Sequence, residues 1–333
     1  MKKFFFLLVA AIVVATATYA QSSMLATLSH EGQISTFYGP LALRDAYASA
    51  ENGDIITLSS GSFNSVDITK GVTIRGAGMG IDKLASTEPT VITGDFKINI
   101  PDEVSERLTL EGIYNNHAIE VCGNFKNGTF LKDRFKDIRY NGSARINNLT
   151  MIHCKVANKI SIPSESSVSC VNCVINGTAV GSGNSSNYEF LNCIVRNDYF
   201  NSDDIGVSTF KNSILIIHNG GNRLYDSAVA YNCIGIGSGY LFYNISNTTN
   251  MIKEFKDVFK TYTGTYNDDE TFELTDDAKA NFLGIDGTQV GIYGGNMPFS
   301  TTPTNPQITK CNVAAKSTAD GKLSVDITVN GAE

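Results

Sequence analysis

A four-residue pattern recurs six times in this chain, and this repeat limits the possible folds more than any other feature. The six segments begin 21, 19, 20, 20 and 20 residues apart, at Phe130, Met151, Cys170, Phe190, Phe210 and Ala230. Their third positions form one column, Lys132, His153, Asn172, Asn192, Asn212 and Asn232. Their fourth positions form another, Asp133, Cys154, Cys173, Cys193, Ser213 and Cys233. Because both columns keep residue type as well as spacing, each segment marks one turn of a repeating structure.

The composition of each turn predicts strands. A leucine-rich repeat of similar period needs regular leucine columns and a short helix in every turn, and the sequence shows neither. Instead, β-branched and aromatic residues alternate with polar ones, and clusters of Gly and Asn separate them. We therefore predict an all-β fold, a parallel β-solenoid with two or three short strands in each turn of roughly 20 residues.

The two columns have a physical explanation in such a solenoid. Equivalent residues of successive turns lie about 4.8 Å apart. Asn adopts the left-handed backbone region more readily than most residues, so the Asn column suits a sharp bend between two strands. We expect its side-chain amides to hydrogen-bond to one another along the column, with His153 as a structural substitute for Asn. The small Cys and Ser side chains of the other column are expected to point inward and fill the corner.

The ends of the chain suggest how the solenoid is closed. An amphipathic helix is predicted near Pro40–Glu51, where it would cap the first turn against edge pairing. A short helix is predicted over Met251–Lys260. Near the C-terminus, Ile308–Val313 and Lys322–Val329 flank Asp320-Gly321 and predict a hairpin. The expected division is a signal peptide (1–20), an N-terminal strand and capping helix (21–53), the solenoid (54–300) and a linker with the hairpin (301–333).

Residues 1–20 have the features of a secretory signal peptide. Lys2 and Lys3 precede an apolar core, Phe4 to Ala15, and cleavage is expected between Ala20 and Gln21. The protein is therefore expected to reach the periplasm, the cell surface or the medium. No later segment has 18 consecutive apolar residues, so no transmembrane segment is expected in the mature chain.

Two stretches carry a family resemblance. Leu43–Leu58 and Val72–Gly78 resemble the first turns of secreted right-handed parallel β-helix proteins with the pectin-lyase-like fold. Gly284–Gly295 resembles a closing segment of such proteins in Bacteroidetes bacteria. The resemblance implies the right-handed form of the solenoid. It leaves the activity open, because this superfamily includes lyases, hydrolases and adhesins.

The resemblance also indicates which catalytic residues to seek. Acidic-polysaccharide lyases of this fold hold Ca²⁺ with Asp and Glu and use Arg or Lys as the base. Asn197–Asp204 and Asn267–Glu270 are the two acidic clusters that could supply calcium ligands, although Ca²⁺ needs six to eight converging oxygens. No other cofactor is predicted. The remaining weak candidates, which loosely resemble the catalytic set of the polygalacturonase family, are Asp203, Asp204, His218 and Arg223.

That resemblance to polygalacturonases is incomplete. The chain has no Gly-His-Gly, no Arg-Ile-Lys and no third Asp one turn earlier in matching register. Cys170 and Cys173 form a CxxC motif, but the repeat accounts for Cys173 without a metal or redox role. A disulfide between neighbouring turns, such as Cys173–Cys193, is sterically allowed, and buried thiols are the expected state.

Two classes of function remain open. The net charge of −7 argues against a nucleic-acid partner. We expect a non-catalytic secreted or surface protein that binds a polysaccharide or host glycan through Tyr and Asn in its turns. The alternative is a polysaccharide lyase or glycoside hydrolase. Carboxylates from adjacent turns that converge with an Arg or Lys in one groove would favour the enzyme.

Overall fold

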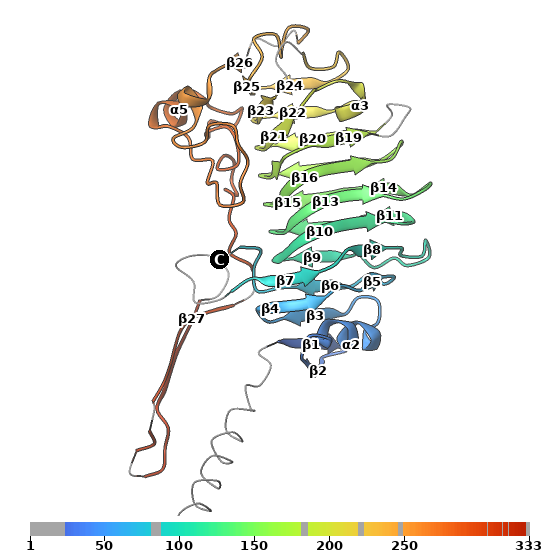
Figure 1. Cartoon of the computed structure of the whole chain (residues 1–333), viewed down its shortest axis with the longest axis vertical. Coiled ribbons are helices and arrows are strands. Elements are labelled where there is room, and N and C mark those ends of the chain that lie inside the picture. The colour runs from blue at the N-terminus through green and yellow to red at the C-terminus, as the bar shows by residue number, and fades with distance from the viewer. Residues whose placement is uncertain are drawn as a thin grey trace, which may run out of the picture.

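The chain folds as a right-handed parallel β-helix of about 9 turns (Figure 1). This computed structural model describes residues 24–80, 88–180, 186–218, 223–245, 249–304, 306–314, 316–318 and 320–330. The predicted signal peptide and its cleavage site lie outside the described residues. The all-β solenoid predicted from the repeat is therefore confirmed.

Two long sheets form the walls of the solenoid. The first sheet has the order β2 (Gln33–Tyr38), β1 (Leu25–His30), β3 (Ile55–Leu58), β6 (Thr73–Arg75), β9 (Thr109–Glu111), β12 (Thr129–Leu131), β15 (Leu149–Ile152), β17 (Ser167–Val171), β20 (Asn187–Leu191), β22 (Thr209–Lys211) and β24 (Val229–Tyr231). The second sheet runs through β4 (Gly61–Asn64), β7 (Thr90–Thr93), β10 (Ile113–Val121), β13 (Arg134–Tyr140), β16 (Lys155–Ile162), β18 (Val174–Ile175), β21 (Ile194–Asn197), β23 (Ile214–Ile217), β25 (Ile234–Ile236) and β26 (Met251–Ile252). Shorter strands pair beside it, β5 (Asp67–Ile68), β8 (Phe96–Ile98) and β19 (Thr178–Val180), and β11 (Asn124–Lys126) pairs with β14 (Arg145–Asn147).

The core is a column of stacked side chains inside the solenoid. Buried inward positions of the first sheet alternate with more exposed outward positions, as the period of two requires. Within it, the Phe190 ring stacks on the Phe210 ring at 5.0 Å and on the Tyr188 ring at 5.4 Å. Tyr188 and Phe190 belong to the same strand, and Phe210 lies at the matching position of the next turn, so side chains of neighbouring turns stack directly on one another inside the solenoid.

The N-terminal end is closed as predicted. Helix α2 (Ala42–Ser49) buries Ala42, Leu43, Ala46 and Tyr47 against the first turn. The Tyr47 hydroxyl accepts backbone N–H bonds from Thr69 at 2.7 Å and Lys70 at 2.9 Å. The hairpin predicted near the C-terminus is also present, as β27 (Gln307–Val313) paired antiparallel with β28 (Val325–Asn330).

The repeat column lies at the bend that follows each strand of the first sheet. Lys132, His153 and the four Asn residues all have φ between 49° and 56°, the left-handed conformation predicted for the column. The side chains of the neighbouring inner column accept the backbone N–H groups that directly follow this bend. The backbone N–H of Cys154 donates to Cys173 Sγ at 3.3 Å, that of Cys173 to Cys193 Sγ at 3.4 Å, and that of Cys193 to Ser213 Oγ at 3.0 Å.

The cysteines of the inner column are buried free thiols. Each Sγ atom accepts the N–H of the preceding turn and lies near a backbone carbonyl, so a thiol or a hydroxyl serves the position equally well. Asp133, at the N-terminal end of the column, accepts the N–H of Ile113 at 2.8 Å. Burial raises the pKa of its carboxyl group well above the usual value.

Substitution of Cys173 tests the hydrogen-bonding role of the inner column. Cys173→Ser is expected to change the free energy of unfolding by less than about 1 kcal/mol, because a hydroxyl can still accept the Cys154 N–H. Cys173→Val leaves that buried N–H without its partner and is expected to cost about 1–3 kcal/mol. Urea denaturation under reducing conditions measures both. Equal losses for Ser and Val would show that the column only fills space.

The C-terminal region differs from the prediction in two ways. Parallel pairing ends at β26, well before residue 300, because the chain then leaves the solenoid and lies against the second sheet. The single helix predicted over Met251–Lys260 is also wrong. Met251–Ile252 continues the sheet as β26, and only α4 (Phe255–Val258) is helical, followed later by α5 (Asp276–Asn281). Residues 253–282 are called the cap below.

Candidate functional site

After the cap, the chain returns along the solenoid toward its N-terminal turns (Figure 1). We call residues 283–304 the strap. The repeat column holds the strap in place. Asn232 Nδ2 donates to Leu283 O at 3.2 Å, and Asn172 Nδ2 to Ile292 O and Gly294 O, both at 2.8 Å. His153 Nε2 bonds to Met297 O at 2.9 Å, and Lys132 Nζ to Thr302 O at 2.6 Å.

These contacts correct the predicted amide ladder. Within the described part of the chain, the column amides make no hydrogen bonds to one another. The amides of Asn172, Asn212 and Asn232 bond to the backbone of the strap instead, while Asn192 Oδ1 is buried without a hydrogen-bond partner in the described structure. Asn212 accepts the Ile285 N–H on Oδ1 at 2.9 Å, while its backbone carbonyl accepts the Gly291 N–H at 2.8 Å. The column therefore serves two purposes: it bends the chain, and it binds the strap.

Glycines allow the strap to approach so closely. A Cβ atom on Gly284 would lie 2.6 Å from Asn212 Cγ, and one on Gly295 would lie 2.4 Å from Asn192 Nδ2. Gly295 also has φ +76°, which side chains rarely permit. The glycine-rich stretch Gly284–Gly295 is thus explained by its contact with the column.

The outer face of the second sheet changes character partway along the solenoid. In its C-terminal turns, one outward column is apolar, and the cap buries it under the residues Val258, Phe259, Tyr262, Phe272 and Leu274. This apolar column consists of Val174, Ile194, Ile214 and Ile234. In the three preceding turns, the same register holds Tyr114, Arg134 and Lys155. The apolar contact between the cap and the second sheet therefore ends where this column becomes polar and charged.

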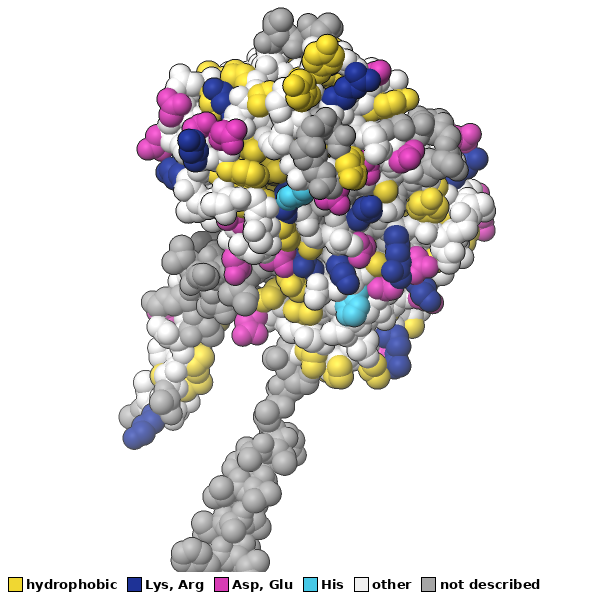
Figure 2. Space-filling model, turned by 45° about the horizontal axis from the view of Figure 1, so that its top comes forward, with side chains coloured by type: hydrophobic (Ala, Val, Ile, Leu, Met, Phe, Trp, Pro, Cys, Tyr) yellow, Lys and Arg dark blue, Asp and Glu magenta, His cyan; other side chains and the backbone are white. Residues whose placement is uncertain are grey.

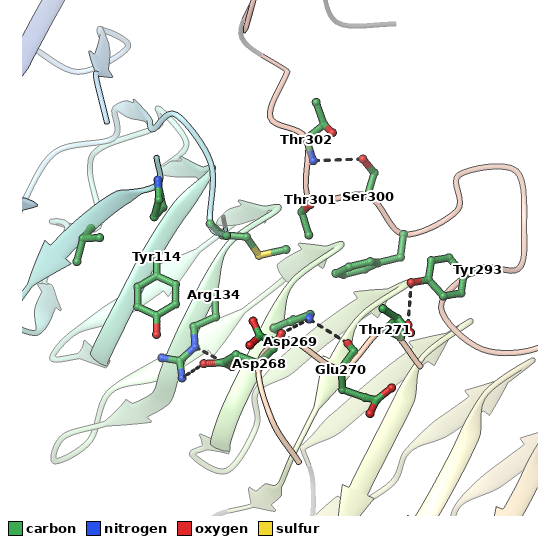
Figure 3. Close-up of a pocket in the computed structure, with 16 residues that line it drawn as sticks. Tyr114, Arg134, Asp268, Asp269, Glu270, Thr271, Tyr293, Ser300, Thr301 and Thr302 are labelled. Carbon is green, nitrogen blue, oxygen red and sulfur yellow. Dashed lines mark hydrogen bonds and ion pairs between the residues drawn. The ribbon is translucent and has the colours of Figure 1, made fainter. Parts of the chain in front are cut away.

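At that boundary lies a cavity of about 950 Å³, which we call the cap groove (Figure 3). The second sheet supplies one wall, and the cap and the strap supply the other. The lining residues are Met79, Gly80, Pro89, Val91, Tyr114, Arg134, Lys155, Asp268, Asp269, Glu270, Thr271, Tyr293, Phe299, Ser300, Thr301 and Thr302. The groove has three aromatic rings, Tyr114 from the second sheet and Tyr293 and Phe299 from the strap.

The two cations of the cap groove are engaged by the cap. Arg134 is 6% exposed and holds the Asp268 carboxylate with two bonds, Nε–Oδ1 at 3.2 Å and Nη2–Oδ2 at 2.8 Å. Lys155 Nζ donates to the backbone carbonyl of Asp268 at 2.7 Å. Burial lowers the pKa of the Lys155 amine, which nearby carboxylates partly offset. Both side chains fasten the cap loop to the solenoid, so neither is placed as an unengaged catalytic base.

The rest of the lining offers ring faces, hydroxyl groups and carboxylates. The Tyr293 hydroxyl donates to Thr271 O at 2.7 Å, which orients the ring, and the Tyr293 and Phe299 rings lie 6.4 Å apart, almost perpendicular. Asp269 is exposed beside Glu270, and its charge acts on the Lys155 amine. Three carboxylates against two cations leave the lining with a net negative charge. The face of the molecule in Figure 2 carries side chains of both signs.

A second hollow of about 530 Å³, the polar basin, lies farther along the second sheet. Its lining is Asn158, Lys159, Asn176, Gly177, Thr178, Arg196, Asn197, Asp198, Tyr199, Asp204 and His218. Two of the predicted catalytic candidates, Asp204 and His218, therefore share one hollow. Arg223 lines a neighbouring hollow and pairs with Asp226 at 3.6 Å, while Asp203 is exposed.

Arg196 bonds to two of the side chains that line the polar basin. It is 4% exposed, its Nη1 donates to Asn176 Oδ1, and its Nη2 donates to His218 Nε2 at 2.9 Å. Because arginine only donates, His218 Nε2 must accept, and its proton resides on Nδ1. Burial and the Arg196 charge lower the pKa of His218. Burial raises the pKa of Asp204, whose Oδ2 has no hydrogen-bond partner in the described structure.

The two acidic clusters considered for calcium have other contacts. In the second, Asp268 pairs with Arg134, and Glu270 Oε1 accepts the Phe272 N–H at 3.2 Å. In the first, Asn201 Oδ1 accepts the backbone N–H of Asp203 and of Asp204. No three His, Cys, Asp or Glu side chains among the described residues are grouped so that they could hold a metal ion.

Sequence reasoning did not single out Arg134 and Lys155. Each directly follows an inner-column residue, where later turns carry Val174, Ile194, Ile214 and Ile234. That change from basic to apolar residues at equivalent positions of successive turns could have indicated in the sequence that the cap covers only the C-terminal part of the second sheet. The partner loop could not be read in the same way, because Asp268 lies more than a hundred residues away in sequence.

Neither a protein family, nor a curated protein, nor a solved structure matches this chain. In the part of the chain that the structure describes, no helix is long and apolar enough to cross a membrane.

Proposed function

We propose that this is a secreted or cell-surface β-helix protein that binds a glycan in the cap groove without transforming it. The observation that carries the proposal is the lining of the cap groove, three aromatic rings beside hydroxyl and carboxylate groups, with both cations already engaged. The resemblance of the first turns to pectin-lyase-like proteins and the signal-like N-terminus support the same assignment.

The lining also indicates which glycans fit. A sugar ring presents C–H groups that pack on aromatic faces, while its hydroxyl groups bond to carboxylates and threonine side chains. A net negative lining disfavours uronic acids, because their carboxylates would face Asp269 and Glu270. We therefore propose a neutral or amino-sugar glycan as the ligand.

Loss of the Tyr293 ring is expected to weaken glycan binding. For a neutral oligosaccharide selected on a glycan array, Tyr293→Ala should raise Kd about tenfold or more, which corresponds to about 1.4 kcal/mol. Tyr293→Phe keeps the ring and should bind nearly as well as the unmodified protein. Tyr243→Ala is a matched control, because Tyr243 is 74% exposed and does not line the cap groove. Isothermal titration calorimetry measures all three, and equal affinity of Tyr293→Ala and Tyr243→Ala would contradict the proposal.

The alternative is a polysaccharide lyase or glycoside hydrolase that acts at the polar basin. The favouring observation is that Asp204, with a raised pKa, and His218, with a lowered pKa, line the same hollow, as a proton donor and a proton acceptor would. A combined reducing-sugar and unsaturated-product assay tests it. Turnover that Asp204→Asn abolishes would replace the binding-only proposal with an enzyme.

A further inference from the structure

The outer side of the first sheet carries two regular columns that the proposed function does not use. One is mainly hydroxyl-bearing: Thr73, Thr109, Thr129, Thr150, Ser169, Glu189, Thr209 and Val229. The other, two residues further along each strand, is apolar in its centre: Arg75, Glu111, Leu131, Ile152, Val171, Leu191, Lys211 and Tyr231. We call these eight strands' outer face the flank.

The flank is regular and partly open to solvent. The strands pair in unshifted register from β6 to β24, so each column follows the strand spacing of about 4.8 Å. Val229 is 36% exposed, and Leu191 and Tyr231 are 38% exposed. The central Leu131, Ile152 and Val171 are half-buried. A periodic, mostly uncharged sheet face of this kind packs well against a second face with the same period.

The order of residues along the flank is self-complementary. A two-fold axis along the strand direction, between β15 and β17, would place each strand opposite its counterpart from the other half. The facing pairs of the apolar column are Ile152 with Val171, Leu131 with Leu191, Glu111 with Lys211, and Arg75 with Tyr231. The facing pairs of the hydroxyl column are Thr150 with Ser169, Thr129 with Glu189, Thr109 with Thr209, and Thr73 with Val229. Apolar residues thus meet apolar residues at the centre. Glu111 is 2% exposed and already bonds to Arg75 and to the Thr304 N–H, so it supplies no partner for Lys211.

Charge favours this arrangement over the other two-fold choice. Arg107 Nη1 lies 3.5 Å from Thr129 Oγ1, so its guanidinium group covers the residue that Glu189 of a second copy would face. A two-fold axis along the solenoid would instead place each strand opposite itself and set Glu189 against Leu191. A carboxylate held against an apolar side chain loses hydration without gaining a partner.

We propose that two copies of this chain associate through the flank, with their solenoid axes antiparallel and Glu189 of each copy paired with Arg107 of the other. The eight strands span about 34 Å, and two columns cover less than the roughly 800 Å² per partner of a standard interface. The dimer is therefore concentration-dependent rather than obligate. The cap groove and the polar basin are lined from the second sheet, so they stay accessible in this dimer.

Sedimentation velocity of the full mature chain over a range of concentrations tests the dimer. Glu189→Arg and Arg107→Glu should each weaken dimerisation about tenfold or more, and the double variant should recover it. Glu254→Arg changes charge by the same amount on the exposed start of the cap and should leave dimerisation unchanged. A protein that stays monomeric at all concentrations, or single variants that dimerise as the control does, would overturn the proposal.

A cross-linking variant tests the orientation independently. Within one chain, β12 and β20 are three strand spacings apart, about 14 Å, which is too far for a disulfide. Facing positions of two packed sheets lie about 10 Å apart. Thr129→Cys combined with Glu189→Cys should therefore give a covalent dimer with a bifunctional thiol reagent of about 8 Å, which cannot span the roughly 14 Å within one chain, and neither single variant should do so to the same extent. A covalent dimer from the single variants alone would indicate another packing and contradict the antiparallel arrangement.

Discussion

Asn212→Val is expected to destabilise the protein by about 3 kcal/mol. Asn212 has φ 52°, and a β-branched residue in the left-handed region costs about 1–2 kcal/mol. The substitution also removes the Oδ1 acceptor of the Ile285 N–H and crowds Gly284, whose position is already too tight for a Cβ atom. Loss of that buried hydrogen bond adds about 1–2 kcal/mol. The bend and the strap contact are thus lost together.

Two further variants separate these contributions. Asn212→Gly keeps the left-handed backbone but removes the side chain, so it should lose about 1 kcal/mol, the value of the strap contact. Asn127→Val is a matched control, because Asn127 has φ 54° in an exposed position and its side chain accepts from Asn148 Nδ2 of the next turn at 3.3 Å. Guanidinium denaturation measures all three. If Asn212→Val cost no more than Asn127→Val, the strap contact would contribute nothing to stability.

Asp268→Ala is expected to release the cap loop and to reduce glycan binding. Arg134 would remain 6% exposed in its pocket without its two-bond carboxylate partner. Breaking a fully buried pair costs about 3–5 kcal/mol, and we expect about 2 kcal/mol here because a third of the Asp268 side chain is exposed. The Tyr266 hydroxyl also loses its acceptor, at 2.9 Å.

Limited proteolysis of residues 253–304 measures release of the cap, and calorimetry measures binding. The control is Asp269→Ala, which removes a neighbouring exposed carboxylate of the same loop without touching the Arg134 pair. It should leave proteolysis unchanged. Equal cleavage of the two variants would mean that the Arg134 pair does not hold the cap.

Several elements could be predicted because short-range rules specify them. The Asn column predicted left-handed bends, and all four Asn residues adopt them. The amphipathic pattern near Pro40–Glu51 predicted the capping helix, and its apolar residues Leu43, Ala46, Tyr47 and Ala50 are buried. The direction of the Asn amides could not be predicted. A left-handed bend leaves the side chain free to bond along the column or outward, and the outcome depends on whether another segment lies alongside.

The sequence by itself determined the solenoid, its period, its inner and outer columns and its capping helix. These follow from a repeat in which every turn contacts only its neighbours, so local pattern and tertiary contact coincide. Only the tertiary structure decided where the cap and the strap lie, that Arg134 and Lys155 hold the loop containing Asp268, and that Asp204 and His218 share a hollow while Arg223 does not. These contacts join segments far apart in the chain, and each occurs only once. They therefore leave no repeated pattern in the sequence from which they could be predicted.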